Sequence, residues 1–424
     1  MNIFLDMVGC RLNQSEIETY ARQLLGAGHT LVSSCEAADI VVINTCSVTE
    51  AAASDSRQKI HQANRGGARE IVVTGCWADL NPEHAKNIPG GSRVVPNSLK
   101  DHLISDLISI NMDKVDLETL ERHPLPGARL RTRAFIKVQD GCDNHCTFCV
   151  ARVARGSAHS RTVAEVIKDI QVSGAKEIVL TGVHLGAWGK DFSPSMHLKD
   201  LITAVLEQTQ VPRVRLSSLE PWDLDSSFFS LWENNRLCRH LHLPIQSGCD
   251  TTLRRMARRI TTAEYGFLLA EARAIIPNVA ITTDLIAGFP GESDGEFLET
   301  LHWVESMQFA NGHVFTFSPR PGTAATRMPD HVPFSIRKAR NTRLRTLLTE
   351  AAISFRKRYV GQTLPVLWEH TNIFSAGNWH LSGLTDNYIR VNAAVPERLW
   401  NTITSVKVTG TTRDGLCGVA SNEG

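Results

Sequence analysis

The feature that most constrains the fold is a strand–helix alternation that occurs twice along the chain. In the first part, the apolar runs IFLDMV, DIVVIN and EIVVTG are each followed by a helical stretch, at residues 15–25, 49–64 and 81–87. This order is typical of a parallel sheet covered by helices. We therefore predict an α/β protein whose first domain, residues 1–122, is an open parallel α/β sheet.

A second, longer alternation follows a segment rich in proline and arginine, RHPLPGARLRTR at 122–133, which we interpret as a linker. Its strand candidates are AFIKVQ, EIVLTG, RVRLSS, HLHLPIQ, AITTDLIAG and HVFTFSP. Six such units predict a partial (β/α)6 barrel over 128–358, and the chemistry of such a barrel belongs at the C-terminal ends of its strands. From Gly361 onward, short alternating strands separated by turn residues predict a small antiparallel β-barrel over 359–424, of the oligonucleotide-binding kind.

Composition limits the class of protein. Hydrophobic residues make up 42% of the chain, and no apolar run reaches the roughly 18 residues of a membrane-spanning helix. The N-terminus meets an acid at Asp6 and has no basic segment of the secretory kind, so we expect a cytoplasmic protein without membrane contact. The 10 cysteines are too few for a disulfide scaffold of this length, and clustered thiols in a reducing compartment more often bind metal.

Three cysteines, Cys142, Cys146 and Cys149, form a C-x-x-x-C-x-x-C motif just after the first barrel strand. Three thiolates so close together can hold a [4Fe–4S] cluster and leave its fourth iron open, where S-adenosylmethionine can bind and be cleaved to a carbon radical. The alternative is a zinc site completed by His145. Phe148 would pack near the adenine of the cofactor. At this motif the chain resembles the radical S-adenosylmethionine superfamily.

A second set of cysteines, Cys10, Cys46 and Cys76, is spread along the first domain, but each follows a predicted strand. The C-terminal ends of parallel strands share one edge of the sheet, so we expect the three thiols to converge there. They predict a second [4Fe–4S] cluster with an open iron that can hold sulfur; three unrelated core residues are the alternative. Cys35 precedes a strand and should be a bystander. The isolated cysteines, which we expect to fill space, are Cys238, Cys249 and Cys417.

The motifs of the whole chain are similar to those of the methylthiotransferase family of radical S-adenosylmethionine enzymes. They are GCRLNQSE, NTCSVTEAA, TGCWA, GCDNHCTFC, ARGSAHSR, LPIQSGCD, LIAGFPGES and SPRPGTAA. The resemblance implies an N-terminal cluster domain, a radical S-adenosylmethionine barrel and a C-terminal TRAM domain that grips RNA or protein. It also implies that two molecules of S-adenosylmethionine are used and that both cysteine trios are catalytic cluster ligands.

Within this family, GCRLNQSE with Ala154-Arg155-Gly156 most resembles the MtaB-type branch. That branch converts N6-threonylcarbamoyladenosine, next to the anticodon of tRNA, to its 2-methylthio derivative. The alternatives are methylthio transfer to N6-isopentenyladenosine or to an aspartate of a ribosomal protein. An RNA-binding iron–sulfur protein without turnover is the non-enzyme alternative. Arg152 departs from the family, where many relatives carry proline. The electron donor and the sulfur source are partners of unknown identity.

Residues at the ends of the barrel strands are candidates to contact the cofactor, and a turn or strand cap is the alternative role for each. They are Thr181, Gly182, Ser218, Glu220, Gln246 and Gly288. For tRNA, the stretch 331–360 carries eight basic residues and only Glu350 as an acid, which fits either phosphate contacts or a solvated helix face. Trp379, Tyr388 and Arg390 are further candidates to contact RNA, each with core packing or the surface as the alternative.

Overall fold

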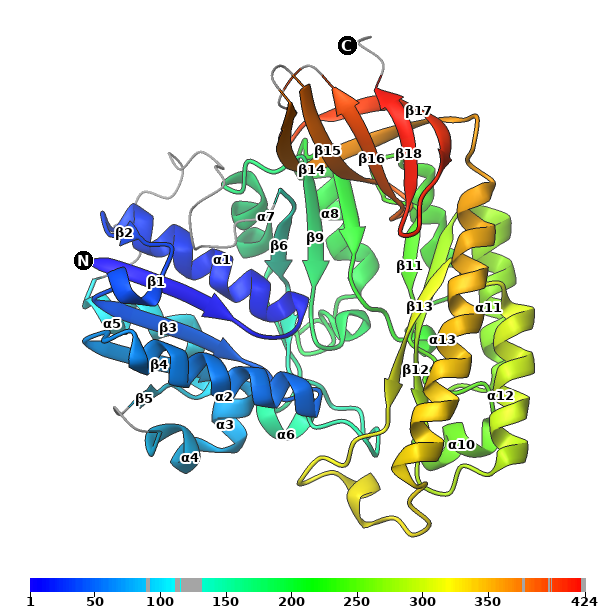
Figure 1. Ribbon diagram of the computed structural model, residues 1–424, viewed down its shortest axis with the longest axis horizontal. Helices are drawn as coiled ribbons and strands as arrows, with labels where there is room; N and C mark the ends of the chain where they lie inside the picture. The colour runs from blue at the N-terminus through cyan, green and yellow to red at the C-terminus, as the bar shows by residue number, and fades with distance from the viewer. Residues whose placement is uncertain are drawn as a thin grey trace.

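The N-terminal part of the computed structural model is an open parallel sheet (Figure 1). The structure describes residues 1–88, 92–110, 115, 132–375, 378–395, 397 and 399–420. The sheet has the order β2-β1-β3-β4-β5, and neighbouring strands are parallel throughout. The predicted sheet is confirmed. Its strands are β1 (Asn2–Met7), β2 (Thr30–Leu31), β3 (Ile40–Thr45), β4 (Glu70–Gly75) and β5 (Arg93–Val94). We did not predict β2 and β5, since a strand of two residues shows no periodicity.

Helices cover both faces of this sheet. Side chains of α1 and α5 pack with one face, and side chains of α2, α3 and α4 pack with the other. All six residues of β3 are buried, which explains why its sequence is apolar without alternation. The helices are α1 (Arg11–Gly26), α2 (Glu50–Arg65), α3 (Cys76–Leu80), α4 (Pro82–Lys86) and α5 (Leu103–Ile108).

The middle of the chain forms the predicted partial barrel. Strands β10-β9-β6 and β11-β12-β13 make two parallel sheets, and the bridges Val214–Leu237 and Ser218–His242 join β10 to the segment of β11. The strands are β6 (Ala134–Lys137), β9 (Glu177–Thr181), β10 (Arg213–Leu216), β11 (His240–His242), β12 (Ala280–Ala287) and β13 (Asn311–Thr316). A small antiparallel pair, β7 (Gln139–Asp140) and β8 (His159–Ser160), lies beyond β6.

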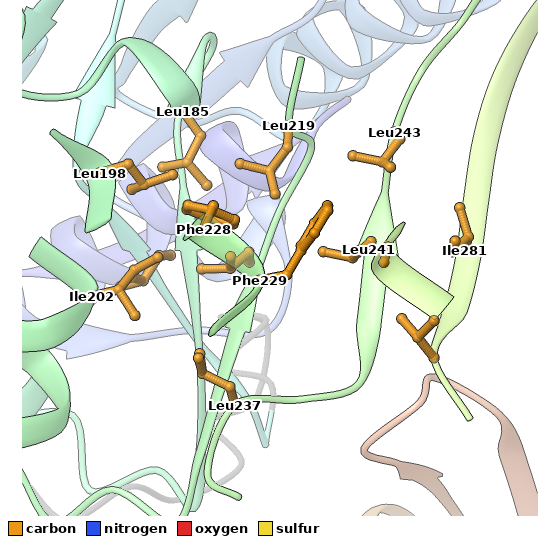
Figure 2. Close-up of a cluster of buried hydrophobic side chains, with 14 of the residues drawn as sticks. Leu185, Leu198, Ile202, Leu219, Phe228, Phe229, Leu237, Leu241, Leu243 and Ile281 are labelled. Atoms are coloured by element: carbon orange, nitrogen blue, oxygen red, sulfur yellow. The ribbon is translucent and has the colours of Figure 1, made fainter. Parts of the chain in front are cut away.

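The hydrophobic core of the barrel lies between its strands and the surrounding helices (Figure 2). Leu241 and Ile281 come from strands, and Ile202 and Phe229 come from helices. The helices are α6 (Ala151–Arg155), α7 (Val163–Gln171), α8 (Leu198–Gln208), α9 (Ser226–Phe229), α10 (Asp250–Arg255), α11 (Thr262–Ile275), α12 (Asp294–Met307) and α13 (Phe334–Lys357). The residues that alternate with these apolar ones along the strands face the inside of the barrel, and they include Arg215 and His240.

Helix α1 of the N-terminal part lies along β6, the edge strand of the partial barrel (Figure 1). The Ser15 hydroxyl accepts a hydrogen bond from the Lys137 backbone at 2.9 Å, and the Glu18 carboxylate accepts one from the Phe135 backbone at 3.4 Å. Side chains of α1 therefore satisfy backbone groups of β6, which is the edge strand of its sheet within the described residues.

The C-terminal strands form a closed barrel in the order β14-β15-β16-β18-β17. The predicted small barrel is confirmed, although β16 and β18 pair in parallel rather than antiparallel. It packs at the end of the large barrel where the strands begin, because Ala280 and Ala310 share its hydrophobic cluster with Val366. The strands are β14 (Thr363–Ser375), β15 (Asn378–Thr385), β16 (Arg390–Val395), β17 (Ile403–Thr411) and β18 (Leu416–Ala420).

The domain boundaries that we expect from the sequence stay predictions. The boundary at 122–128 and most of the linker at 122–133 lie outside the described residues. The boundary at 358–359 falls just after the end of α13. Among the helices that the structure describes, none combines the length and the apolar character needed to cross a membrane.

Glu177, at the start of β9, holds a buried group of arginines together. Its carboxylate lies 2.7 Å from Arg215 Nε and 3.6 Å from Arg213 Nη1, and the side chain is 0% exposed. Burial alone would raise the pKa of Glu177, but the charge of Arg215 holds it below its ordinary value.

Replacing Glu177 with glutamine is expected to lower the free energy of unfolding by about 3–5 kcal/mol, because buried guanidinium groups lose their carboxylate. Urea denaturation followed by circular dichroism measures this change. The control is Glu207→Gln on the exposed side of α8, which should unfold like the wild type. Equal midpoints for both variants would contradict the role of Glu177.

Candidate active site

The three N-terminal cysteines come together at one edge of the first sheet. Cys10 precedes α1, Cys46 follows β3 directly, and Cys76 begins α3 directly after β4. The approach is close enough to require glycine beside Cys10: a Cβ on Gly9, whose φ is +110°, would lie 2.5 Å from the Cys46 sulfur. Cys46 and Cys76 are buried and Cys10 is exposed, so the group has one side open to solvent.

Asn13 fixes the loop that carries Cys10. Its side-chain amide donates to the Val8 carbonyl at 2.7 Å and to the Thr45 carbonyl at 3.0 Å. These two carbonyls belong to the segments that lead to Cys10 and Cys46. We assigned no role to Asn13 from the sequence, since its partners are distant along the chain.

The central cysteines lie in a loop after β7, at the C-terminal ends of the barrel strands. The backbone of Cys142 donates to the Gly156 carbonyl at 3.1 Å, and the backbone of Cys149 donates to the Cys146 carbonyl at 3.1 Å. Thr147 ties the loop to the rest of the barrel, because its amide donates to Met256 and its carbonyl accepts from Ala325. Cys149 is exposed, so this group also has an open side.

Each group of cysteines has a buried arginine beside it. Arg155 Nε donates to the Cys76 sulfur at 3.3 Å, and Arg258 Nη1 donates to the Cys146 sulfur at 3.7 Å. Both side chains are nearly inaccessible to solvent, at 3% and 1% exposed. A buried positive charge next to thiols favours their deprotonated form, which is the form that binds metal.

Without metal, burial favours the protonated form of Cys46 and of Cys146. Burial and the neighbouring Cys10 raise the pKa of Cys46 to about 12. Burial also raises the pKa of Cys146, although the charge of Arg258 acts in the opposite direction. Metal binding at either place must therefore release protons.

Each group supplies three cysteines, which is the donor set that holds a [4Fe–4S] cube. Within the described residues, no three His, Cys, Asp or Glu side chains are grouped as ligands of one ion. In a cube, each thiolate binds a different iron, so its ligands stand farther apart than those of one ion. His145, the candidate fourth ligand for zinc, lies instead against Arg152, with their nitrogens 2.6 Å apart.

Arg155 connects the two groups of cysteines. From the sequence we used it only as part of the motif Ala154-Arg155-Gly156 and assigned it no contact with the cysteines. Its Nη1 lies 2.9 Å from the Asp140 carboxylate, two residues before Cys142, and 3.1 Å from the Glu16 carboxylate of α1. Its Nη2 donates to Asn13 at 2.8 Å. One side chain thus touches Cys76 and Asp140, which lies two residues before Cys142, and it links the surroundings of both groups.

Replacing Arg155 with alanine is expected to lower the free energy of unfolding by about 3–5 kcal/mol, because Glu16 and Asp140 lose a buried partner. It should also make Cys76 react more slowly with an alkylating reagent in the metal-free protein, because the thiolate that reacts loses the neighbouring positive charge. Arg152→Ala, an exposed arginine on the same helix, is the matched control and should change neither quantity. Unchanged stability and labelling in the Arg155 variant would show that the two parts are held by other contacts.

The candidate cofactor residues lie around the mouth of the barrel. Thr181 ends β9, and a Cβ on the next residue, Gly182, would lie 2.8 Å from Gln139 Oε1. Ser218 pairs with His242 beyond the end of β10, and Gln246 has a positive φ of 79°. Gly288, just beyond β12, has a φ of +74° and lies against Arg337.

Two other candidates make protein contacts of their own. The Glu220 carboxylate accepts a hydrogen bond from Arg258 at 2.7 Å, on the side of the guanidinium that does not touch Cys146. Phe148 packs against a hydrophobic cluster that contains Phe289 and Phe317. Their contacts with a cofactor stay predictions.

His184 is a further polar residue at the mouth that the sequence did not reveal. Its Nε2 lies 2.5 Å from the Asp223 carboxylate, and its Nδ1 lies 3.3 Å from the amide of Asn144 in the cysteine loop. Burial lowers the pKa of His184, but Asp223 and the nearby Cys142 together raise it to about 9. Asp223 thus favours the protonated form of an imidazole that lies close to the central cysteines.

The remaining cysteines lie elsewhere. Cys35 is buried in the core under α2, as expected. Cys238 and Cys249 are buried in the barrel part and Cys417 lies in β18, away from both groups.

The basic residues of the stretch 331–360 lie in two different environments, one buried and one exposed. Arg340 is buried and pairs with Glu292 at 2.7 Å, whereas Lys338 and Arg345 are exposed on α13. Of the other candidates for RNA contact, Trp379 packs against the core of the C-terminal barrel, and Arg390 donates to Ser382 at 3.0 Å.

Comparison with known proteins covers both α/β parts of the chain. Residues 2–95 match an uncharacterized protein family, UPF0004, and residues 136–304 match the radical SAM superfamily. The threonylcarbamoyladenosine tRNA methylthiotransferase MtaB of Thermotoga maritima is 36% identical, over 91% of this chain and 90% of that protein. A tRNA-2-methylthio-N(6)-dimethylallyladenosine synthase of Bacillus mycoides is 31% identical, over 96% of this chain and 83% of that protein.

A solved structure shares the fold. The radical S-adenosylmethionine methyltransferase TsrM of Kitasatospora setae superposes with a TM-score of 0.59 and 13% identity. The superposition covers 77% of this chain and 74% of that one. At this identity, the likeness concerns the fold alone.

Proposed function

Because the chain belongs to the methylthiotransferase family of radical S-adenosylmethionine enzymes, we propose that it adds a methylthio group to C2 of N6-threonylcarbamoyladenosine in tRNA, next to the anticodon. The observation that carries the proposal is the pair of cysteine groups that Arg155 connects at one mouth. The name of the Thermotoga maritima relative supports the choice of nucleoside. A cytoplasmic location stays a prediction.

The residues present fit two [4Fe–4S] clusters. Cys142, Cys146 and Cys149 would hold one, and Cys10, Cys46 and Cys76 would hold the other. When bound, the clusters supply the radical chemistry that attacks an unactivated C–H bond and the iron that holds sulfur. The proposal includes the use of two S-adenosylmethionine molecules. It also requires an electron donor and a sulfur source, and it does not name either partner.

The polypeptide itself contributes position and charge. Arg155 and Arg258 donate hydrogen bonds to one thiol in each group, and both guanidinium groups are buried away from water. Gln139 accepts a hydrogen bond from the His184 backbone at 2.8 Å and donates to the Gly141 carbonyl at 2.8 Å. These bonds hold the strand-end turn and the cysteine loop in one arrangement, which keeps the reacting groups near each other.

A second candidate substrate is N6-isopentenyladenosine in tRNA, which the name of the Bacillus mycoides relative favours. A ribosomal-protein aspartate is another acceptor for the same chemistry. An RNA-binding iron–sulfur protein without turnover would release no 5′-deoxyadenosine from S-adenosylmethionine. These alternatives differ in the product that each yields.

The test uses the anaerobically reconstituted protein, a reductant, a sulfide source and S-adenosylmethionine. Two anticodon stem-loop RNAs, with threonylcarbamoyladenosine or isopentenyladenosine at the same place, are incubated separately, and their nucleosides are measured by mass spectrometry. The proposal predicts the 2-methylthio product from the threonylcarbamoyladenosine RNA. Product from the isopentenyladenosine RNA alone would assign the chain to the other substrate.

A further inference from the structure

Several polar side chains point to the inside of the partial barrel below the mouth. Val214, Leu241 and Ile281 belong to the hydrophobic layer under the helices. Side chains alternate along a strand, so the next residues point to the inside of the barrel. They are Arg215, His240 and Thr282.

Two residues from outside the barrel meet in this space. Tyr388, in the turn between β15 and β16, stacks on His240 with ring centroids 4.5 Å apart. Arg11 is the first residue of α1, the helix that lies along β6, and its Nη2 donates to the Tyr388 hydroxyl at 3.3 Å. The N-terminal sheet domain, the large barrel and the C-terminal barrel therefore each contribute a residue to one site inside the large barrel.

Positively charged side chains surround Tyr388 at this site. The guanidinium groups of Arg11, Arg133 and Arg215 lie 5.6, 5.5 and 5.0 Å from the Tyr388 ring. Burial would raise the pKa of Tyr388, but the three guanidinium groups lower it to about 8. His240 adds no further positive charge, because burial and Arg215 lower its pKa and favour the neutral form.

Arg11 differs from the other two arginines in its partners. Arg133 and Arg215 each lie 2.7 Å from a glutamate oxygen, of Glu369 and Glu177 respectively. Within the described residues, Arg11 forms no ion pair, and the Tyr388 hydroxyl is its hydrogen-bond partner. A half-buried guanidinium beside a neutral partner keeps donors that suit a carboxylate.

We propose that Arg11 binds the carboxylate of the threonylcarbamoyl group of the target adenosine and so selects this nucleoside over one with an uncharged N6 substituent. The inference rests on the proposed function. Arg11 directly follows Cys10, so a substituent held by its side chain keeps the adenine beside the N-terminal cysteines. Asp284 also faces the inside, and its carboxylate lies 3.4 Å from His242 Nε2.

Binding of two stem-loop RNAs tests the proposal without turnover. One carries threonylcarbamoyladenosine, and the other carries the same nucleoside with its carboxylate converted to a methylamide. The wild type should bind the carboxylate RNA more tightly. Arg11→Gln should weaken binding of that RNA by about tenfold to a hundredfold, the usual effect of losing one charge-assisted contact, and should leave the amide RNA unchanged.

Two further variants separate this contact from general effects. Arg11→Lys keeps the charge and should retain part of the preference. Lys338→Gln removes one exposed charge on α13, outside the barrel, and should affect both RNAs equally. If Arg11→Gln also affects both RNAs equally, or if the wild type shows no preference, the proposal is wrong.

Failure of this inference is distinguishable from failure of the proposed function. A wild type that methylthiolates the threonylcarbamoyladenosine RNA, together with an Arg11→Gln variant that keeps the binding preference, would remove the role of Arg11 alone. A wild type that forms no product from this RNA would remove the proposed substrate, and the inference with it.

Discussion

Replacing Cys46 with alanine is expected to stop methylthio transfer completely while leaving the cleavage of S-adenosylmethionine intact. Cys46 lies in the N-terminal group, whose proposed task is to hold the cluster that carries sulfur. The central cysteines, proposed to support cleavage, keep all their contacts in this variant. Mass spectrometry of one reaction mixture measures both products, 5′-deoxyadenosine and the 2-methylthio nucleoside.

The matched control for this variant is Cys35→Ala. Cys35 is also a buried cysteine of the N-terminal part, but it lies in the core under α2. Its replacement should leave both products at wild-type levels if the protein stays folded. Normal methylthio product from the Cys46 variant would overturn the division of labour between the two groups.

Replacing Cys146 with alanine is expected to reduce both products to background. Cys146 lies in the central loop, beside Arg258, and is proposed to be one of three ligands of the cluster that binds S-adenosylmethionine. With one ligand removed, the cofactor is neither held nor cleaved, so no radical reaches the RNA. Release of 5′-deoxyadenosine, compared with wild type under the same reductant, is the measurement.

Cys249→Ala serves as the control here, because Cys249 is a buried cysteine of the same barrel that precedes α10. It should cleave S-adenosylmethionine at the wild-type rate. If the Cys146 variant cleaves equally well, Cys146 is not a ligand.

Much of the fold could be predicted because its strands are long enough to show a pattern. The runs DIVVIN and EIVVTG correspond to β3 and β4, and the short strands β2 and β5 were missed. The parallel pairing of β16 with β18 was also missed, since local alternation indicates a strand but not its neighbour. Convergence of the N-terminal cysteines followed from the rule that parallel strands end at one edge.

The residues that join the parts of the chain could not be predicted from local sequence. Arg155 contacts Cys76 and Glu16, which lie 79 and 139 positions away in the sequence. Arg11 and Tyr388 are separated by 377 positions. Such contacts depend on how α1, the barrel and the C-terminal strands pack together, and no periodicity records that packing. Tyr388, a candidate for RNA contact, lies inside the large barrel beside Arg11.

Iron content tests the central claim most directly, namely that each group of cysteines holds its own cluster. After anaerobic reconstitution, the wild type should contain about eight irons per chain. A variant with Cys10, Cys46 and Cys76 changed to alanine should contain about four, and so should the matching variant of Cys142, Cys146 and Cys149. A wild type with about four irons, or an N-terminal triple variant that retains about eight, would contradict the account.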